Sequence, residues 1–146
     1  MLFLDCKTFI DIKEKEEVLI YAKTRNSLVY EIEKLCMLNN NELIGYIERE
    51  AYKLNPLDVS CFISENNKVY ALVGTKRYTV REKLYQLEEI YSETFLKINQ
   101  SCFANEKKIR KFSSTITGSI MVTFDNNYKD YISRRELKNV KERMGL

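Results

Sequence analysis

The sequence contains no histidine among its 146 residues, so the side chain that most often acts as a general base in enzymes is missing. It also has no glycine-rich loop of the kind that cradles phosphate groups. Cys102 lies in a polar stretch, but no candidate base stands near it in the sequence, which argues against a nucleophilic thiol. We therefore predict a protein that is not an enzyme and that has neither catalytic residues nor a cofactor.

The cysteines are few and widely spaced, at positions 6, 36, 61 and 102. No two of them have the Cys-x-x-Cys spacing of a zinc site, and no histidine is present to complete a ligand set. In a reducing compartment such thiols stay free. We predict no metal site, and we expect the cysteines to pack as small, buried, apolar side chains.

One proline and four glycines leave little room for linkers or low-complexity segments. No run of 18 uncharged apolar residues could form a transmembrane helix, and the N-terminus lacks the basic and long apolar regions of a signal peptide. The length fits one domain, or one domain with a small appendage. We expect a cytoplasmic protein that does not insert into the membrane.

Residues 1–41 are predicted to form a small β-α unit. Alternating apolar residues between positions 2 and 12 and the apolar run at 18–22 indicate strands. Residues 26–38 have helical periodicity, with a stripe that consists of Leu28, Ile32, Leu35 and Cys36. The unit is too short to fold well alone. We expect it to pack on the rest of the chain or to carry self-association.

Residues 43–146 are predicted to be a separate domain of mostly antiparallel strands. Short strand-like segments follow each other, with a hairpin turn at residues 65–67, a second one at 125–127 and no βαβ alternation. Capping-box patterns at Thr79-Val-Arg-Glu82 and Ser133-Arg-Arg-Glu136 indicate the starts of two amphipathic helices. The second helix is expected to bury Leu137, Val140, Met144 and the stem of Lys141, and to end at Gly145. The predicted fold class is mainly β (α+β), antiparallel sheets with short amphipathic helices.

Charge is distributed unevenly along the chain. Residues 1–96 hold 13 Lys and Arg against 16 Asp and Glu, a net charge of −3, whereas residues 97–146 hold 11 against 5, a net charge of +6. A basic segment of this kind suits nucleic acid, but it also suits an acidic protein.

A polar cluster in residues 95–105 offers groups that can read bases. Asn99, Gln100 and Ser101 stand between apolar residues, which indicates a loop held by two strands. Their side chains carry both donors and acceptors, as base edges in a DNA groove require. Basic residues that could contact phosphates flank this cluster, namely Lys97, Lys107, Lys108, Arg110 and Lys111. The alternative is a polar turn with a solvated basic flank.

Together with the C-terminal segment 131–146, this stretch resembles the LytTR family of bacterial DNA-binding domains. The residues that match its two sequence patterns are Phe95, Lys97, Ser101, Ala104 and Asn105 in the first, and Ser133, Arg134, Arg135, Leu137 and the final Met-Gly in the second. The resemblance covers about residues 43–146. It departs at Asn99, where the family frequently has a histidine, and at Gln100, where it usually has Arg or Asn. It implies a mostly β fold with short helices.

The resemblance also implies a sequence-specific transcription regulator that binds double-stranded DNA at paired repeats as a dimer, sometimes beside a membrane-protein partner. We expect no receiver domain, because a domain of that size does not fit in the residues upstream of residue 43. The positions that match the family's DNA-facing residues are Asn66, Asn67 and Lys68, then Asn99, Gln100 and Ser101, and finally Arg135, with Arg134 beside it. Arg135 could fork onto a guanine and Gln100 could bridge an adenine, and the alternative for Arg135 is an ion pair with Glu136 or Glu142.

Two other functions stay open at this point. Ten tyrosines and seven phenylalanines could provide stacking platforms for a single-stranded nucleic acid. The basic segment could instead bind an acidic protein partner in a module that does not contact nucleic acid.

Overall fold

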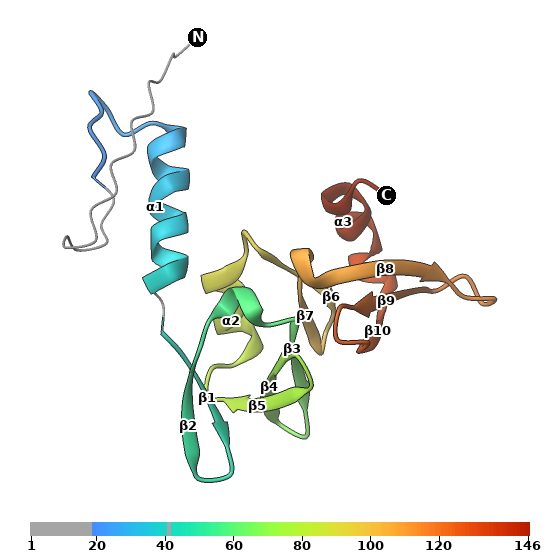
Figure 1. The fold of residues 1–146 in the computed structure, drawn as a ribbon. Helices are drawn as coiled ribbons and strands as arrows, with labels where there is room; N and C mark the ends of the chain where they lie inside the picture. Colours follow the sequence, from blue (N-terminus) through green and yellow to red (C-terminus); the bar gives the residue numbers. More distant parts are fainter. Residues whose placement is uncertain (1–18, 41) are drawn as a thin grey trace. The chain divides into compact units, whose positions relative to one another are not determined.

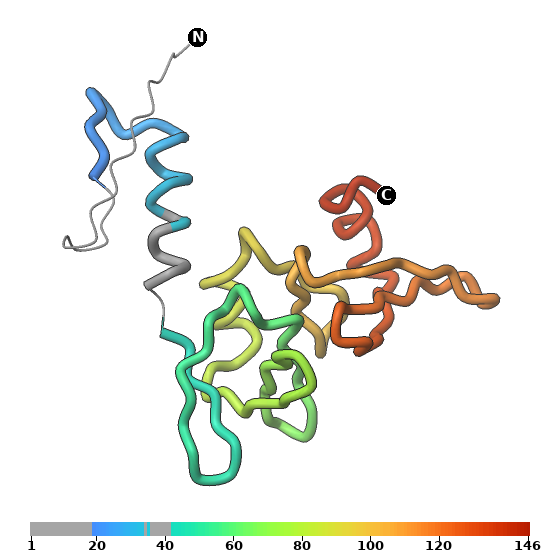
Figure 2. Tube along the Cα trace, viewed as in Figure 1, coloured from blue at the N-terminus to red at the C-terminus, as the bar shows by residue number. Residues whose placement is uncertain are grey.

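The computed structural model describes residues 19–40 and 42–146. The chain divides into two compact units, Met1–Cys36 and Met37–Leu146, and Figures 1 and 2 trace them in sequence order. The strand predicted between residues 2 and 12 lies outside the described residues. None of the described helices is long and apolar enough to cross a membrane.

Helix α1 (Ser27–Asn40) is the N-terminal helix predicted from the sequence. It begins after Asn26, whose Oδ1 accepts a hydrogen bond from the Val29 N–H at 3.0 Å, as an N-cap residue does. Leu28 and Leu35 are exposed in the predicted apolar stripe, and Ile32 is half-buried. The prediction of a strand at residues 18–22 is wrong for residues 19–22, which pair with no strand of the described residues.

A seven-stranded antiparallel sheet dominates the second unit. Its spatial order is β2-β1-β5-β4-β3-β7-β6. The strands are β1 (Leu43–Ile47), β2 (Glu50–Leu54), β3 (Cys61–Glu65), β4 (Lys68–Val73), β5 (Lys76–Val80), β6 (Phe95–Asn99) and β7 (Cys102–Asn105). Short 3-10 turns at Pro56–Asp58 and Glu106–Lys108 precede β3 and follow β7.

A second sheet has three strands in the order β10-β9-β8. These are β8 (Ile109–Ser114), β9 (Ile120–Phe124) and β10 (Lys129–Ile132). Two helices complete the unit, α2 (Leu84–Tyr91) and α3 (Arg134–Met144). The predicted fold class, antiparallel β with short helices, is confirmed.

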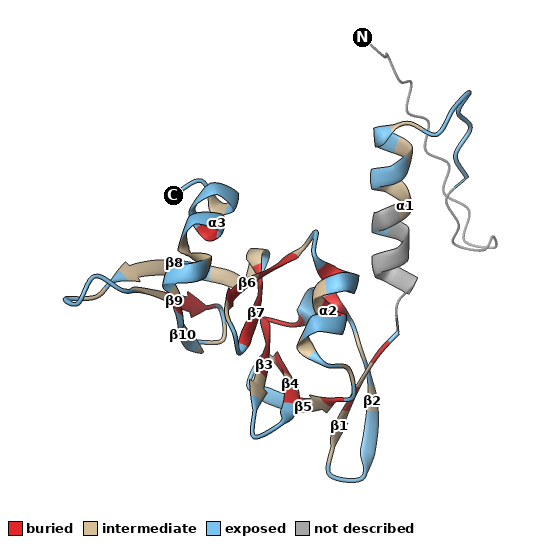
Figure 3. Ribbon diagram, turned by 180° about the vertical axis from the view of Figure 1, so that it is seen from behind, coloured by how far each residue is buried: buried red, intermediate tan, exposed pale blue. Residues whose placement is uncertain are grey.

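Two apolar clusters form the core of this unit, and Figure 3 shows the buried segments in red. One cluster packs α2 against the large sheet and includes Phe62, Leu87 and Phe95. The other joins the large sheet to the small sheet and α3, and it includes Leu96, Val122 and Val140. Phe95 and Leu96 are neighbours in β6 that enter different clusters, because successive side chains of a strand point to opposite faces.

The predicted start of α2 at Thr79 is wrong. Thr79 belongs to β5, where it is paired with Tyr70 of β4 and with Tyr46 of β1. The buried neighbours Tyr78 and Val80 hold this segment in the sheet. The helix begins at Leu84 instead, where the Gln86 side chain accepts a hydrogen bond from the Lys83 N–H at 2.9 Å.

The C-terminal segment follows the prediction more closely. Ser133 caps α3, since its Oγ accepts a hydrogen bond from the Glu136 N–H at 3.3 Å, and Gly145 ends the helix with a left-handed φ of 72°. Val140 is buried, and Leu137 and Met144 pack against the core, as expected, whereas Lys141 as a whole residue is exposed.

The strand predicted at Lys107–Phe112 begins later, at Ile109, because the Asn105 side chain accepts a hydrogen bond from the Lys107 N–H and holds a 3-10 turn there. The strand also runs on to Ser114, into the segment predicted as a loop.

Gly45 lies where β1 crosses the core, and a side chain has no room there. A Cβ at this position would lie 2.6 Å from both Tyr78 Cβ and Leu54 Cδ1. We expect Gly45→Ala to lower the free energy of unfolding by about 1–3 kcal/mol, because the backbone must shift to relieve the clash. Urea denaturation followed by circular dichroism measures this. Ala51→Val, at an exposed position of neighbouring β2, should stay within about 0.5 kcal/mol, and equal midpoints for Gly45→Ala and the wild type would contradict the expectation.

Candidate nucleic-acid interface

Two of the three predicted loops lie side by side at one end of the large sheet. The hairpin predicted with its turn at residues 65–67 is present, and its two-residue β3–β4 turn consists of Asn66 and Asn67, whose φ values of 51° and 62° suit such a turn. The β6–β7 turn carries Gln100 and Ser101. β3 pairs with β7, and the Ser64 N–H donates to the Ser101 carbonyl at 2.8 Å. Both turns therefore lie at the same end of the strands of this sheet.

The third predicted segment, the junction of β10 and α3, is tied to the same place. The Ser133 N–H donates to the Ile98 carbonyl at 2.8 Å. Asn99 Nδ2 donates to the Tyr131 carbonyl at 2.8 Å and to Asp130 Oδ1 at 3.0 Å. These bonds hold the start of α3, and with it Arg134 and Arg135, next to the β6–β7 turn.

Asn99 itself is engaged within the protein. Besides its two donated bonds, its Oδ1 accepts a hydrogen bond from the Ser101 N–H at 2.8 Å. The side chain thus joins the β6–β7 turn to β10 and fixes the shape of the turn that displays Gln100. That Asn99 reads a base remains a prediction, and its bonds give it a positioning role.

The side chains around it are open to solvent. Lys68, Gln100 and Arg135 are exposed. Neither Arg134 nor Arg135 forms an ion pair with any residue that the structure describes, Glu136 and Glu142 included. We call this set of residues the recognition edge: Asn66, Asn67, Lys68, Gln100, Ser101, Arg134 and Arg135. It combines amide, hydroxyl, ammonium and guanidinium groups, the chemistry that base edges and phosphates require.

The other predicted basic residues lie elsewhere. Lys97 stands on β6 and contacts Glu88 of α2, with Nζ and Oε1 3.7 Å apart. Lys107 and Lys108 occupy the 3-10 turn after β7, beside Ser60 at the start of β3. Because β3 has five residues, this turn lies about 17 Å from the recognition edge. Arg110 is exposed in the next strand, β8.

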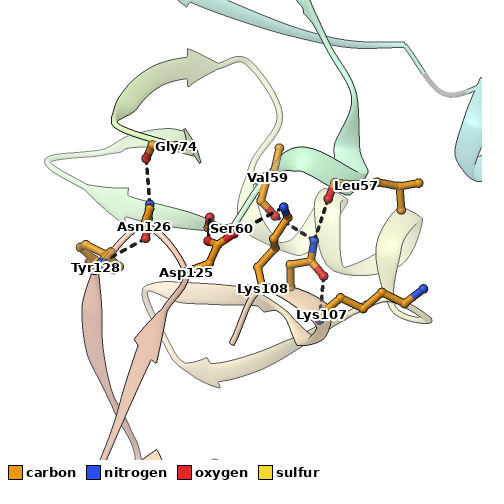
Figure 4. A network of polar contacts seen from close by, with 10 residues as sticks. Leu57, Val59, Ser60, Gly74, Lys107, Lys108, Asp125, Asn126 and Tyr128 are labelled. Atoms are coloured by element: carbon orange, nitrogen blue, oxygen red, sulfur yellow. Dashed lines mark hydrogen bonds and ion pairs between the residues drawn. The ribbon is translucent and has the colours of Figure 1, made fainter. Parts of the chain in front are cut away.

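A polar network occupies this far end of the sheet (Figure 4). Ser60 Oγ donates to Asp125 Oδ1 at 2.8 Å, and Lys108 Nζ lies 3.4 Å from Asp125 Oδ2. The Asn126 side chain donates to the Gly74 carbonyl at 3.0 Å. Lys108 is therefore partly neutralised where it joins the two sheets, and its local role is structural.

Sequence reasoning missed two residues at or near the recognition edge. Tyr131 is half-exposed, and its carbonyl holds Asn99. Arg77 of β5 pairs with Glu65 and stacks over the Tyr70 ring at 4.3 Å from its centroid, which braces the β3–β4 turn. Both contacts join residues distant in the chain, and the only local signal was that Tyr131 stands two residues before Ser133.

The described thiols are inert. Cys61 and Cys102 are free and buried, as predicted, whereas Cys6 lies outside the described residues and the side chain of Cys36 is not described. The hydrogen bond to Cys61, followed by burial, raises the pKa of Cys102 well above its ordinary value, so this thiol stays protonated and unreactive. In the described part of the chain no three potential ligands cluster to hold a metal ion.

Comparison with known proteins decides the family. Residues 49–145 match the family model of the LytTr DNA-binding domain. The chain belongs to the LytTR family. Two Staphylococcus aureus proteins, from strains MSSA476 and NCTC 8325, are each 30% identical to it over 141 residues, which cover 94% of this chain and 96% of theirs. Both bear the name uncharacterized HTH-type transcriptional regulator.

A solved LytTr DNA-binding domain from Bacillus cereus shares the fold, with a TM-score of 0.67 and 13% identity over 73% of this chain and 99% of that one. In this LytTR protein the consecutive described helices are separated by five strands each. The described residues therefore contain no helix-turn-helix unit.

Proposed function

We propose that this LytTR protein is a transcription regulator that binds double-stranded DNA in a sequence-specific manner through the recognition edge. The observation that carries the proposal is the convergence of three sequence-distant segments, 66–68, 99–101 and 134–135, through the bonds Ser64–Ser101, Ser133–Ile98 and Asn99–Tyr131. A single rigid edge with unpaired arginines is what reading several adjacent bases requires.

Each exposed side chain suits a different part of a DNA groove. Arg135 can donate two hydrogen bonds to guanine O6 and N7, and Gln100 can bridge adenine N6 and N7. Lys68, Arg134 and Ser101 suit the flanking phosphates. Lys97, Lys107, Lys108 and Arg110 lie away from this contact and act only through the net charge of +6 in residues 97–146, which draws the duplex toward the domain.

The single-stranded alternative finds less support among the aromatic residues. Phe62, Phe95, Phe103 and Phe124 are buried in the two core clusters and cannot stack on bases. Tyr85 on α2 and Tyr131 beside the recognition edge are exposed, but they do not form a row of stacking platforms of the kind single strands require.

Selection from randomised pools tests the proposal. The protein is incubated at about 150 mM salt with duplexes that carry a randomised segment and, separately, with the matching single strands. We expect one duplex sequence to be enriched and to bind at least about 10³-fold more tightly than scrambled duplex. Enrichment from the single-stranded pool alone, or equal binding to every duplex, would refute sequence-specific duplex recognition.

We further propose that the protein binds paired DNA sites as a homodimer, with residues 1–41 as the self-association unit and 43–146 as the DNA-binding domain. The described part of the first unit has several exposed apolar side chains, among them Leu19, Leu28 and Leu35. Leu28→Asp/Leu35→Asp should shift the mass measured by light scattering from dimer to monomer, while Tyr85→Asp, at an exposed site on α2, should not. A wild-type protein that is monomeric throughout would exclude the homodimer, although a membrane-protein partner would remain a separate proposal.

A further inference from the structure

The three-stranded sheet has one face that packs against the core and a second face that points away from it. The residues of its strands that enter the core or pack against it are Ile109, Phe112, Ile120, Val122, Phe124 and Ile132. Residues directly opposite each other in neighbouring strands point to the same face. Lys111 is opposite Thr123, and Thr123 is opposite Lys129, so these three side chains form one row across the other face.

Thr123, at the centre of this row, has a side-chain hydroxyl that forms no hydrogen bond. Its residue is 1% exposed, and its Oγ1 is buried with no hydrogen-bond partner. A buried hydroxyl left unpaired costs about 1–3 kcal/mol, and most buried polar groups in folded proteins are paired. The side chain belongs to the face that points away from the core cluster, between two lysines. A group from outside can pair with the hydroxyl once the side chains that cover it move aside.

Because two lysines flank the hydroxyl, the group best suited to pair with it is an anion. Lys111 and Lys129 are exposed, and neither forms an ion pair with a described residue. Their strands flank β9 on either side, so their backbones are about 10 Å apart, and both flexible stems can reach one group above Thr123. Two ammonium groups and a hydroxyl donor suit a tetrahedral phosphate oxyanion.

The row is connected to the recognition edge through Tyr131 and Asn99, the residue before Gln100. Lys129 stands two residues before Tyr131 in β10, and the Tyr131 carbonyl accepts a hydrogen bond from Asn99. Two strand residues span about 7 Å, which is close to the spacing of successive phosphates along a DNA strand. A duplex held at the recognition edge could therefore place a backbone phosphate over this row.

We propose that Lys111, Thr123 and Lys129 form a phosphate-binding site on the outer face of the β8–β9–β10 sheet. Its occupant is a phosphodiester of the DNA backbone if the proposed function is right, and otherwise a free phosphate group. The site would extend the contact with DNA beyond the turns without reading sequence.

Two arms of one experiment test the site and identify the source of the phosphate. In the first arm, inorganic phosphate is titrated into the full-length protein, and the amide NMR signals of residues 111, 123 and 129 are followed. In the second arm, the salt dependence of affinity for duplex DNA is measured by fluorescence anisotropy. Lys111→Gln/Lys129→Gln is compared with Lys83→Gln/Lys141→Gln, which removes the same charge at exposed positions.

We expect phosphate to shift these signals in the wild type and in the control but not in Lys111→Gln/Lys129→Gln. We also expect the slope of log affinity against log salt to become about one unit less steep in that variant than in the control. Loss of the phosphate response with an unchanged slope would keep the site and identify a free phosphate as its ligand. Equal behaviour of the two double variants in both arms would overturn the site.

Thr123→Val separates binding from folding. It keeps the shape of the side chain and removes the unpaired hydroxyl, so the free energy of unfolding should stay the same or rise. The same variant should weaken phosphate binding roughly tenfold, because a hydrogen bond to a charged group is lost. A wild-type protein that binds phosphate but no duplex would refute the proposed function and leave this site standing, whereas unchanged phosphate binding by Thr123→Val would remove the hydroxyl from the site.

Discussion

Replacement of Phe62 by alanine is expected to lower the free energy of unfolding by about 3–5 kcal/mol. Phe62 is 0% exposed and stands at the centre of an aromatic group drawn from β3, β6, β7 and α2. Its ring centroid lies 5.3 Å from that of Phe95, 6.1 Å from that of Tyr91 and 6.5 Å from that of Phe103. Truncation would leave a cavity where four elements meet, and the loss is a large part of the about 5–15 kcal/mol that stabilises a typical domain.

Urea denaturation followed by circular dichroism measures this effect. Phe62→Leu refills most of the volume and should cost less than about 1.5 kcal/mol, so the difference between the two variants reports the cavity. A Phe62→Ala protein that unfolds within about 1 kcal/mol of the wild type would show that these rings do not form the centre of the core.

The second large effect is expected at Asn105, which closes the first of the two family sequence patterns. Asn105 is 2% exposed. Its Nδ2 donates to the Val59 carbonyl at 2.9 Å and to the Leu57 carbonyl at 3.3 Å, and its Oδ1 accepts from the Lys107 N–H at 3.1 Å. One side chain thus satisfies backbone groups on two separate segments, so its role is to hold the fold.

Asn105→Ala should therefore cost about 2–4 kcal/mol of unfolding free energy, because buried carbonyl and amide groups lose their partners. Asn99→Ala is the matched control, since Asn99 is half-buried at the other end of the sheet and water can replace its bonds. We expect a cost of about 1 kcal/mol there. Thermal or urea unfolding of both variants decides the point, and equal costs would contradict the structural role of Asn105.

Local signals in the sequence were sufficient for most of the fold. The Asn-Asn turn at 66–67 and the cap at Ser133 depend on residues a few positions apart, and both are present in the structure. The start of α2 was not predictable in this way, because the capping-box pattern at Thr79 competes with strand pairing to Tyr70 and Tyr46. Pairing with these other strands keeps Thr79 in β5, and such pairing cannot be seen in the local residue pattern around Thr79.

The same distinction applies to the candidate site: its residues could be identified from the sequence, but their positions in space could not. The sequence and the family resemblance together selected Gln100, Ser101 and Arg135, and the structure places them at one edge. The sequence could not show that Lys107 and Lys108 lie at the far end of β3. A run of basic residues does not reveal on which side of the folded domain the charges lie. The sequence also could not show that the Asn99 side-chain amide donates hydrogen bonds to the Tyr131 carbonyl and to Asp130.

The central claim is that the recognition edge reads DNA, and one comparison of affinities tests it most directly. On the duplex selected from the randomised pool, Arg135→Ala should weaken binding by about 1–3 kcal/mol, that is, about 5- to 150-fold. It should also reduce discrimination at one base pair, measured against duplexes with single substitutions. Lys107→Ala, which removes the same charge at the far end of the sheet, should weaken binding to every duplex only a few-fold and alter no base preference. If Lys107→Ala had the larger effect and Arg135→Ala left every base preference unchanged, the recognition edge would not be the DNA-reading surface.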